Sequence, residues 1–133
     1  MIGVVVVTHG QLATELVNAA EMIVGDLPRF TAVSIGWHDD VNDAREEIAQ
    51  AIERVDGEAG VLVLTDMFGG TPSNLAISCM SRPKVEVLAG INLPMLVKLA
   101  KVREERSLPD AIAMAQEAGR KYVTIASRVL AGK

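Results

Sequence analysis

The sequence predicts an α/β fold: an open, doubly wound sheet of four parallel strands with helices on both faces. Short apolar runs alternate along the chain with longer segments of helical periodicity, which is typical of strand–helix–strand units. The runs at 2–8 and 61–65 are apolar without a polar face, as in strands that a parallel sheet buries on both sides. No repeat, low-complexity tract or linker interrupts this pattern, so residues 1–133 are predicted to form a single domain.

The first half of the chain predicts two strands, each followed by a helix. The strand at 2–8 precedes a helix that ends at Gly25, a residue type suited to a helix C-cap. The strand at 30–35 precedes a loop at 36–40 whose acidic end suits the start of a second helix. The apolar stripe of the first helix is predicted at Leu12, Leu16, Ala19 and Ile23, and that of the second at Val41, Ala44, Ile48, Ile52 and Val55.

The third and fourth strands are predicted at 61–65 and 85–89. After the third strand, Thr71 is the expected N-cap and Pro72 the expected first residue of a helix that runs to about residue 80. A short helix at about 94–101 follows the fourth strand.

The last part of the chain predicts one more helix and a fifth strand. The run Ser107 to Asp110 resembles a capping box that opens the helix, and Gly119 is expected to end it. The apolar tail 122–126 is predicted to be the fifth strand, although residues 127–130 could instead extend a helix.

Composition excludes several classes of protein. The formal charge is −4 and aromatic residues make up only 3% of the chain, whereas a nucleic-acid binder needs a basic face and stacking rings. Cys79, the one cysteine, cannot form an intrachain disulfide, which suits a reducing compartment. No apolar run approaches the roughly 18 residues that span a bilayer. We therefore expect a cytoplasmic protein that needs no metal or cofactor.

Two polar side chains follow the apolar strands at 2–8 and 61–65, and they are the candidate catalytic pair. His9 ends the first run and Asp66 ends the other. If the strand order is flavodoxin-like, these strands are neighbours, and ligands bind beyond their carboxyl ends. A carboxylate that accepts the proton of one ring nitrogen fixes the tautomer of the imidazole and leaves the other nitrogen free to attack. A lone histidine here would be read as an ordinary polar residue; with Asp66, it is predicted to be a phosphoryl acceptor.

The turn after Asp66 offers donors for a phosphoryl group. Gly69 and Gly70 permit close backbone approach, and Thr71 adds a hydroxyl at the start of a helix, where anions bind. Gly10, beside the histidine, is assigned to the same phosphate-binding group. Without His9, the better interpretation of this turn would be an ordinary Thr cap.

Residues outside this group are assigned to the rim of the site. Phe68, Asn92 and Pro94 lie on the same predicted edge and are candidate rim residues, with loop shaping as the alternative for the last two. His38 lies in a loop at this edge and is predicted to be solvated or at the rim, because no carboxylate is placed beside it as Asp66 is beside His9.

These motifs resemble the IIA domain of the mannose family of the bacterial phosphoenolpyruvate-dependent sugar phosphotransferase system. The similarity extends over nearly the whole chain. The residues that carry it are Thr8-His9-Gly10, Ala20-Glu21-Met22 with Gly25, Asp66 with Gly69-Gly70-Thr71-Pro72 and Asn74, and the run 89–96. Met67 and Phe68 depart from the family pattern, which has a smaller or polar residue and a tryptophan there, so a different partner-facing surface is expected.

The resemblance implies a phosphoryl carrier in carbohydrate uptake. His9 would be phosphorylated by an HPr-type phosphocarrier and would pass the group to a IIB component, with Asp66 as its carboxylate partner and Thr71 as the phosphate-side hydroxyl. The IIB component is expected to be a separate chain, because no IIB domain follows before Lys133. Association with the membrane would be indirect, through IIC and IID components. The resemblance also implies a homodimer in which an antiparallel fifth strand is exchanged between subunits.

Three other functions compete with this one. The chain could be a stand-alone regulatory phosphoprotein of the same fold that signals phosphotransferase state without transport. A response-regulator receiver would use Asp66 as the phosphoryl acceptor. That fold requires an acidic pair after the first strand, and this chain has Thr8-His9-Gly10 there. A dinucleotide-binding domain is disfavoured because no G-x-G-x-x-G follows the first strand.

Overall fold

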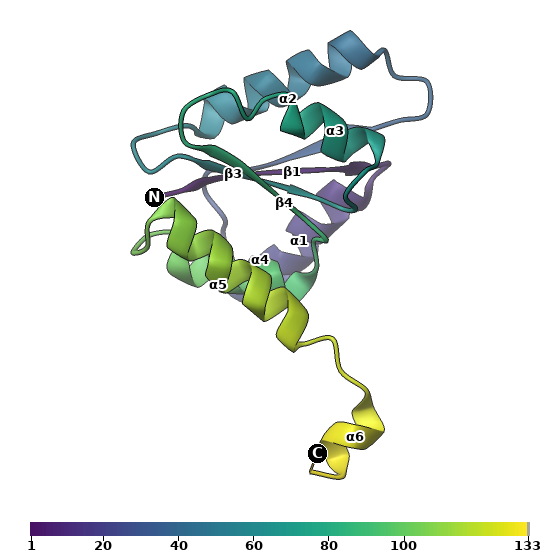
Figure 1. The fold of residues 1–133 in the computed structure, drawn as a ribbon, viewed down its shortest axis with the longest axis vertical. Helices are drawn as coiled ribbons and strands as arrows, with labels where there is room; N and C mark the ends of the chain where they lie inside the picture. The colour runs from purple at the N-terminus through teal and green to yellow at the C-terminus, as the bar shows by residue number, and fades with distance from the viewer. Residues whose placement is uncertain (133) are drawn as a thin grey trace.

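In the computed structural model, which describes residues 1–132, the chain folds into three layers. Figure 1 shows the sheet edge-on, with α2 and α3 covering one face and α1, α4 and α5 covering the other. The strands are β1 (Gly3–His9), β2 (Phe30–Ile35), β3 (Val61–Thr65) and β4 (Val85–Ala89). The helices are α1 (Leu12–Val24), α2 (Val41–Val55), α3 (Thr71–Ile77), α4 (Leu93–Val102), α5 (Leu108–Lys121) and α6 (Ala126–Leu130). The prediction of an α/β fold with helices on both faces is confirmed.

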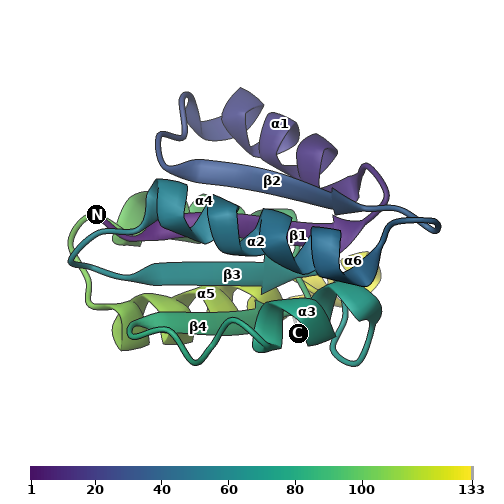
Figure 2. The same cartoon turned by 90° about the horizontal axis from the view of Figure 1, so that it is seen from above.

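The four strands are parallel and lie in the order β2-β1-β3-β4 (Figure 2). The chain therefore reverses its direction of winding after β2, and the switch point falls between β1 and β3. In the register of these two strands, Val7 lies opposite Thr65, so the residues that follow each strand leave the sheet at the same edge. The assumed flavodoxin-like order of the site strands is confirmed.

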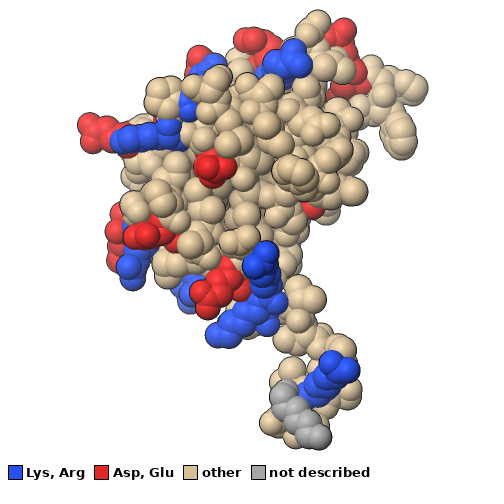
Figure 3. Space-filling view, in the orientation of Figure 1, with Lys and Arg blue, Asp and Glu red and all other residues tan. Residues whose placement is uncertain are grey.

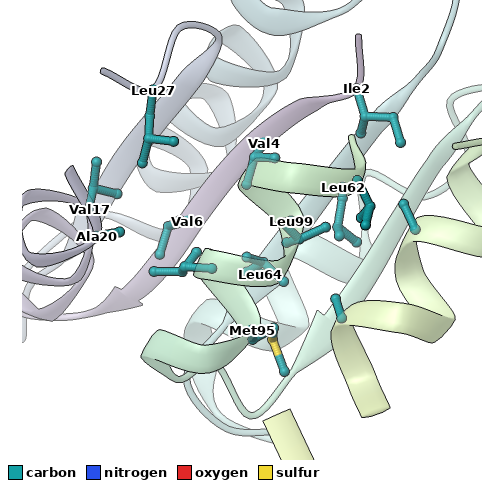
Figure 4. Packing of buried hydrophobic residues seen from close by; sticks show 14 of the residues in the cluster. Ile2, Val4, Val6, Val17, Ala20, Leu27, Leu62, Leu64, Met95 and Leu99 are labelled. Atoms are coloured by element: carbon teal, nitrogen blue, oxygen red, sulfur yellow. The ribbon is translucent and has the colours of Figure 1, made fainter. Parts of the chain in front are cut away.

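One core layer lies between the sheet and helices α1, α4 and α5. Alternate side chains of β1 and β3 point into it, which is the period of two that a strand imposes. Figure 4 shows this packing, in which Val4, Val6, Leu62 and Leu64 meet Val17 and Ala20 of α1 and Met95 and Leu99 of α4. Because Val4 to Val7 of β1 are all apolar, the strand buries its other face equally well.

The second core layer lies between the sheet and helices α2 and α3. Val5, Val7 and Val63 point into it from the strands, and α2 contributes the buried stripe predicted from the sequence, except that Val41 is exposed. Asp40 caps α2, because its side chain accepts hydrogen bonds from the backbone N–H groups of Asn42 and Asp43. The acidic end of the preceding loop therefore starts the helix as predicted.

The predicted apolar stripe of α1 is wrong by one position. The buried residues are Ala13, Val17 and Ala20, whereas Leu12 and Ile23 are 46% and 58% exposed. Two stripes at helical spacing run side by side on this helix, and the sequence pattern selected the one with larger side chains. The stripe that packs most deeply against the sheet carries Ala13, Val17 and Ala20. Leu16 of the predicted stripe is partly buried against the same core, and Leu12 and Ile23 remain exposed.

Three predicted helix boundaries also differ. Gly70, not Thr71, is the N-cap of α3, so Thr71 is its first residue and Pro72 its second. α3 ends at Ile77, before the predicted Met80. α5 continues through Gly119 to Lys121, and Gly119 is buried within it, where a Cβ atom would meet the end of the Met95 side chain at 2.9 Å and the Asn92 amide at 3.4 Å.

The predicted fifth strand is not formed within the described chain. Residues 123–125 have no regular structure, and α6 follows them, as in the alternative that residues 127–130 extend a helix. Figure 1 shows this tail standing away from the three layers. A strand exchanged with a second chain has no partner to pair with here, so the exchange stays a prediction. Lys133, the last residue of the predicted domain, lies outside the described residues.

The face of the molecule seen in Figure 3 carries side chains of both signs. On the face seen in Figure 3, basic and acidic side chains are interspersed around the margin, and much of the area between them is uncharged. No helix in the described part of the chain is both long and apolar enough to cross a bilayer.

Candidate functional site

His9 is the last residue of β1, and three hydrogen bonds hold the backbone around it. Its own N–H donates to Asp66 Oδ2 at 3.0 Å, and the N–H of Gly10 donates to the carbonyl of Ile35 at 2.9 Å. Its carbonyl accepts from the hydroxyl of Thr8 at 3.2 Å. Gly10 has a φ of 54°, a left-handed conformation that favours glycine and turns the chain away from the sheet toward α1.

The structure brings His9 and Asp66 together as predicted. Nδ1 of His9 lies 2.7 Å from Oδ2 of Asp66. An ionised carboxylate only accepts hydrogen bonds, so Nδ1 must be the donor, and in a neutral ring Nε2 then carries the lone pair. The carboxylate thus selects the tautomer in which the outer nitrogen is the nucleophile. The side chain of His9 is 54% exposed and that of Asp66 only 13%, so the ring is accessible and its partner is shielded.

The environment of Asp66 favours the ionised form. Burial by itself raises the pKa of this carboxyl group, but hydrogen bonds from the backbone N–H and the ring of His9, and from the N–H of Met67, outweigh it. The net pKa of Asp66 is therefore lowered from its ordinary value. Near neutral pH this carboxylate is charged and can balance positive charge on the His9 ring.

The Cε1–Nε2 edge of the His9 ring lies beside the turn at Gly70. A Cβ atom added to Gly70 would lie 3.0 Å from Cε1 of His9 and 3.6 Å from Nε2, so the turn packs directly against the ring. Gly69 has a φ of 92°, which a residue with a side chain rarely adopts. The two predicted glycines therefore serve different needs: Gly69 makes the turn, and Gly70 makes room for the imidazole.

Thr71 and the rim residues occupy different places. Thr71 is exposed at the first position of α3, one residue beyond the turn that touches the ring. Phe68 is 77% exposed at the tip of the same loop. Asn92 uses its side chain to cap α4, accepting from the N–H of Met95 at 3.1 Å and donating to the carbonyl of Gly119 at 3.0 Å. Pro94 lines a groove of about 310 Å³ between α1, α4 and α5. The structure therefore groups Phe68 and Thr71 with the His9 turn, and directs Asn92 toward α5.

The loop between β2 and α2 contributes no partner to the pair. His38 is exposed, and the side chain of Trp37 beside it is 99% exposed. Within residues 1–132, no group of three histidine, cysteine, aspartate or glutamate side chains is close enough to hold a metal ion.

Thr8 was named only as part of the Thr8-His9-Gly10 motif and was given no role of its own, yet its side chain makes two hydrogen bonds at the site. The residue is fully buried, and Oγ1 accepts from the N–H of Ala13 at 2.7 Å as well as donating to His9. A hydroxyl residue that ends an otherwise apolar run, four residues before the start of a helix, was the available signal.

Comparison with known proteins identifies the family of the chain. The family model for EIIA-man, described as "PTS system fructose IIA component", matches residues 3–116. The fructose-specific EIIA component of Bacillus subtilis is 33% identical over 88% of this chain and 84% of its own length. The mannose/sorbose specific IIA subunit of Enterococcus faecalis has a similar structure, with a TM-score of 0.84, 30% identity and 93% of each chain covered.

The chain belongs to the EIIA-man family of the phosphotransferase system. The mannose-specific EIIAB component of Escherichia coli strain K12 is 34% identical over 92% of this chain, but the chain spans only 38% of that protein's length. The resemblance inferred from the three motifs is therefore confirmed.

For this EIIA-man chain, Asp66→Asn should make the free energy of unfolding less dependent on pH in the acidic range. Because the pKa of Asp66 is lower in the folded state, its ionised form stabilises the fold above the unfolded value of about 4. That stabilisation is lost as pH falls through the folded pKa, and an amide has no such titration. Urea unfolding measured from about pH 2.5 to 6 should give curves for wild type and Asp66→Asn that converge toward the acid end. Parallel curves would contradict the lowered pKa.

Gly70→Ala should displace the His9 ring, because the new methyl group would need the ring to move by a few tenths of an ångström. We expect a changed His9–Asp66 hydrogen bond, visible as shifted ring ¹⁵N resonances. Gly36→Ala is the control, since its Cβ would meet only the end of the Asp39 side chain at 3.2 Å. Unchanged His9 resonances in Gly70→Ala would show that this contact does not orient the ring.

Proposed function

We propose that this chain is a phosphoryl carrier of the sugar phosphotransferase system, with His9 as the acceptor. The observation that carries the proposal is the division of the ring: Nδ1 is held by Asp66 at 2.7 Å, and Nε2 faces the Gly70 turn on an exposed side chain. Membership of the EIIA-man family supports the same role. The donor in this proposal is an HPr-type phosphocarrier, and the group passes on to a IIB component.

The transfer needs only groups that this chain and its donor supply. The lone pair of Nε2 attacks the phosphorus of the donor phosphohistidine, so a P–N bond forms at His9 while the P–N bond of the donor breaks. The donor imidazole leaves with the electron pair of the broken bond. Positive charge develops on the His9 ring during attack, and the Asp66 carboxylate stabilises it across the Nδ1–H hydrogen bond. Transfer to the IIB component reverses these roles.

The surroundings of Nε2 suit the phosphoryl group through dipoles rather than cations. The loops 9–12, 36–40, 66–71 and 90–94 at this edge contain no lysine or arginine. In the proposal, Gly10, Gly69 and Gly70 bring backbone close to the phosphoryl oxygens, and the hydroxyl of Thr71 donates to one of them. Phe68 forms the rim that a partner protein meets, with Asn92 and Pro94 as further candidates.

The cellular role follows from the family rather than from the site. We infer a cytoplasmic carrier that joins the membrane only through IIC and IID components, with residues 1–133 acting as one domain. The second candidate is a regulatory phosphoprotein with the same phosphohistidine, whose state is read by a partner without transport. Both candidates predict the same chemistry at His9. If sugar uptake requires this chain, the carrier role is favoured over the regulatory one.

We also propose a homodimer with an exchanged C-terminal strand. β4 is an edge strand, and a groove of about 600 Å³ runs beside it, bounded by β4 and the start of α5. The tail beyond α5 exposes apolar side chains at Tyr122, Val123 and Ile125. A strand formed by residues 122–126 of a second copy would pair with the open edge of β4 and bury both surfaces.

Labelling should place the phosphoryl group on His9. With phosphoenolpyruvate, enzyme I and HPr, wild type should acquire a label that is labile in acid and stable in base, as expected for a phosphoramidate. His9→Ala should abolish it. Asp66→Asn should slow transfer roughly 10- to 1,000-fold, because its amide favours the wrong tautomer and carries no charge. Mass spectrometric mapping of the labelled residue is the measurement.

His38→Ala is the matched control for these variants, since it removes the other histidine and should accept label at near the wild-type rate. A loss of more than about tenfold would bring His38 into the site. An acid-stable label, or one that survives His9→Ala and is lost with Asp66→Asn, would make Asp66 or a hydroxyl the acceptor and end the proposal.

Truncation before Tyr122 should convert the proposed dimer to a less soluble monomer, because the edge of β4 loses its partner. Light scattering at micromolar concentration should give a dimer mass for the full chain. A stable, monodisperse monomer of the full chain would contradict the exchange.

A further inference from the structure

The hydroxyl of Thr8 joins three parts of the fold in a place that water does not reach. Thr8 is fully buried at the end of β1, and its Oγ1 accepts from the N–H of Ala13 at 2.7 Å and donates to the carbonyl of His9 at 3.2 Å. One small group thus links the strand that carries the histidine, the carbonyl of the histidine itself, and the first turn of α1. Neither bond is to the imidazole, so any effect on the ring must act through the backbone.

The bond to Ala13 takes the place of a helix cap. A helix leaves its first N–H groups without partners, and the N-cap side chain normally satisfies one of them. The N-cap of α1 is Gln11, whose side chain makes no such bond. Thr8 supplies the missing acceptor from outside the helix, so the start of α1 is fastened to the end of β1 across the intervening turn at residues 9–11.

We propose that Thr8 is a positioning residue for His9, holding the turn so that Nδ1 meets Asp66 and Nε2 faces Gly70. This inference rests on the proposed function of His9 as phosphoryl acceptor. The turn is anchored on its other sides by Asp66 Oδ2 and by the carbonyl of Ile35. Thr8 supplies the anchor on the α1 side. Losing the hydroxyl leaves the N–H of Ala13 and the carbonyl of His9 without this partner, and frees the turn to shift relative to β3.

A threonine nearby provides a matched control. Thr65 directly precedes Asp66 as Thr8 directly precedes His9, it is also fully buried, and its Oγ1 has no hydrogen-bond partner within residues 1–132. Replacing an unpartnered buried hydroxyl by a methyl group of the same shape is close to neutral or stabilising. Thr65→Val should therefore leave the orientation of His9 unchanged. Thr8→Val makes the same replacement of a hydroxyl by a methyl group, but it removes two hydrogen bonds.

The test compares Thr8→Val, Thr8→Ser and Thr65→Val in the full chain. The first readout is the set of His9 ring ¹⁵N resonances, which report the tautomer and the bond to Asp66 without any phosphoryl donor. We expect shifted resonances in Thr8→Val and wild-type resonances in the other two. The second readout is labelling by phospho-HPr, for which kcat should fall roughly 10- to 100-fold in Thr8→Val, while KM changes less than about threefold.

Thr8→Ser keeps the hydroxyl and should restore kcat to within about threefold of wild type. Should Thr8→Val fail to fold, the comparison of Thr8→Ser with Thr8→Ala replaces it, because these two variants differ only in the hydroxyl oxygen. Wild-type ring resonances in the variants that lack the hydroxyl would overturn the role of Thr8. Equal loss of kcat in Thr8→Ser and Thr8→Ala would overturn it too.

The two proposals fail separately. If wild type carries its label on a residue other than His9, the proposed function fails, while the ring resonances still decide whether Thr8 orients the histidine. If wild type is labelled on His9 and Thr8→Val is labelled as fast with an unchanged ring, only the inference about Thr8 is lost.

Discussion

The geometry of the site depends on one carboxylate oxygen. Oδ2 of Asp66 accepts from the backbone N–H of His9 at 3.0 Å and lies 2.7 Å from its Nδ1, while Oδ1 accepts from the N–H of Met67 at 2.9 Å. A single side chain thus fixes the end of β1, the rotation of the imidazole and the start of the loop after β3. This is possible only because β1 and β3 are neighbours in a register that sets Val7 opposite Thr65. The apolar strands and the layers that bury them are the support for that register.

The sequence predicted the pair because two strong signals coincide there. Long β-branched runs mark strands that are buried on both sides, and a polar residue directly after such a run must leave the sheet at its carboxyl edge. His9 and Asp66 are such residues. The strand order that makes them neighbours was assumed from a common topology, since nothing in a single sequence encodes which strands pair. The contact of Gly70 with the ring was beyond prediction for the same reason, because it depends on distances between loops.

The misplaced stripe of α1 and the missing fifth strand show where local patterns lose to tertiary context. In α1, apolar residues occupy two adjacent helical faces, and hydrophobicity alone cannot choose between them. In the folded chain Ala13, Val17 and Ala20 are buried against the sheet, and Leu12 and Ile23 stay exposed. In the tail, the apolar side chains have no surface to cover within one chain, so the strand pattern has nothing to pair with.

The different exposure of the two side chains in the pair has a chemical consequence. A phosphoryl acceptor that exchanges its group with other proteins must present its nucleophilic nitrogen at the surface, where water weakens electrostatic interactions. His9 meets this need at 54% exposure, and Asp66 sits behind it at 13%. The carboxylate is shielded and receives two backbone hydrogen bonds, which hold it in place behind the ring. In the proposed function, the group that sets the tautomer thus lies inside the fold, and the nitrogen proposed to react is the part of the site that reaches the surface.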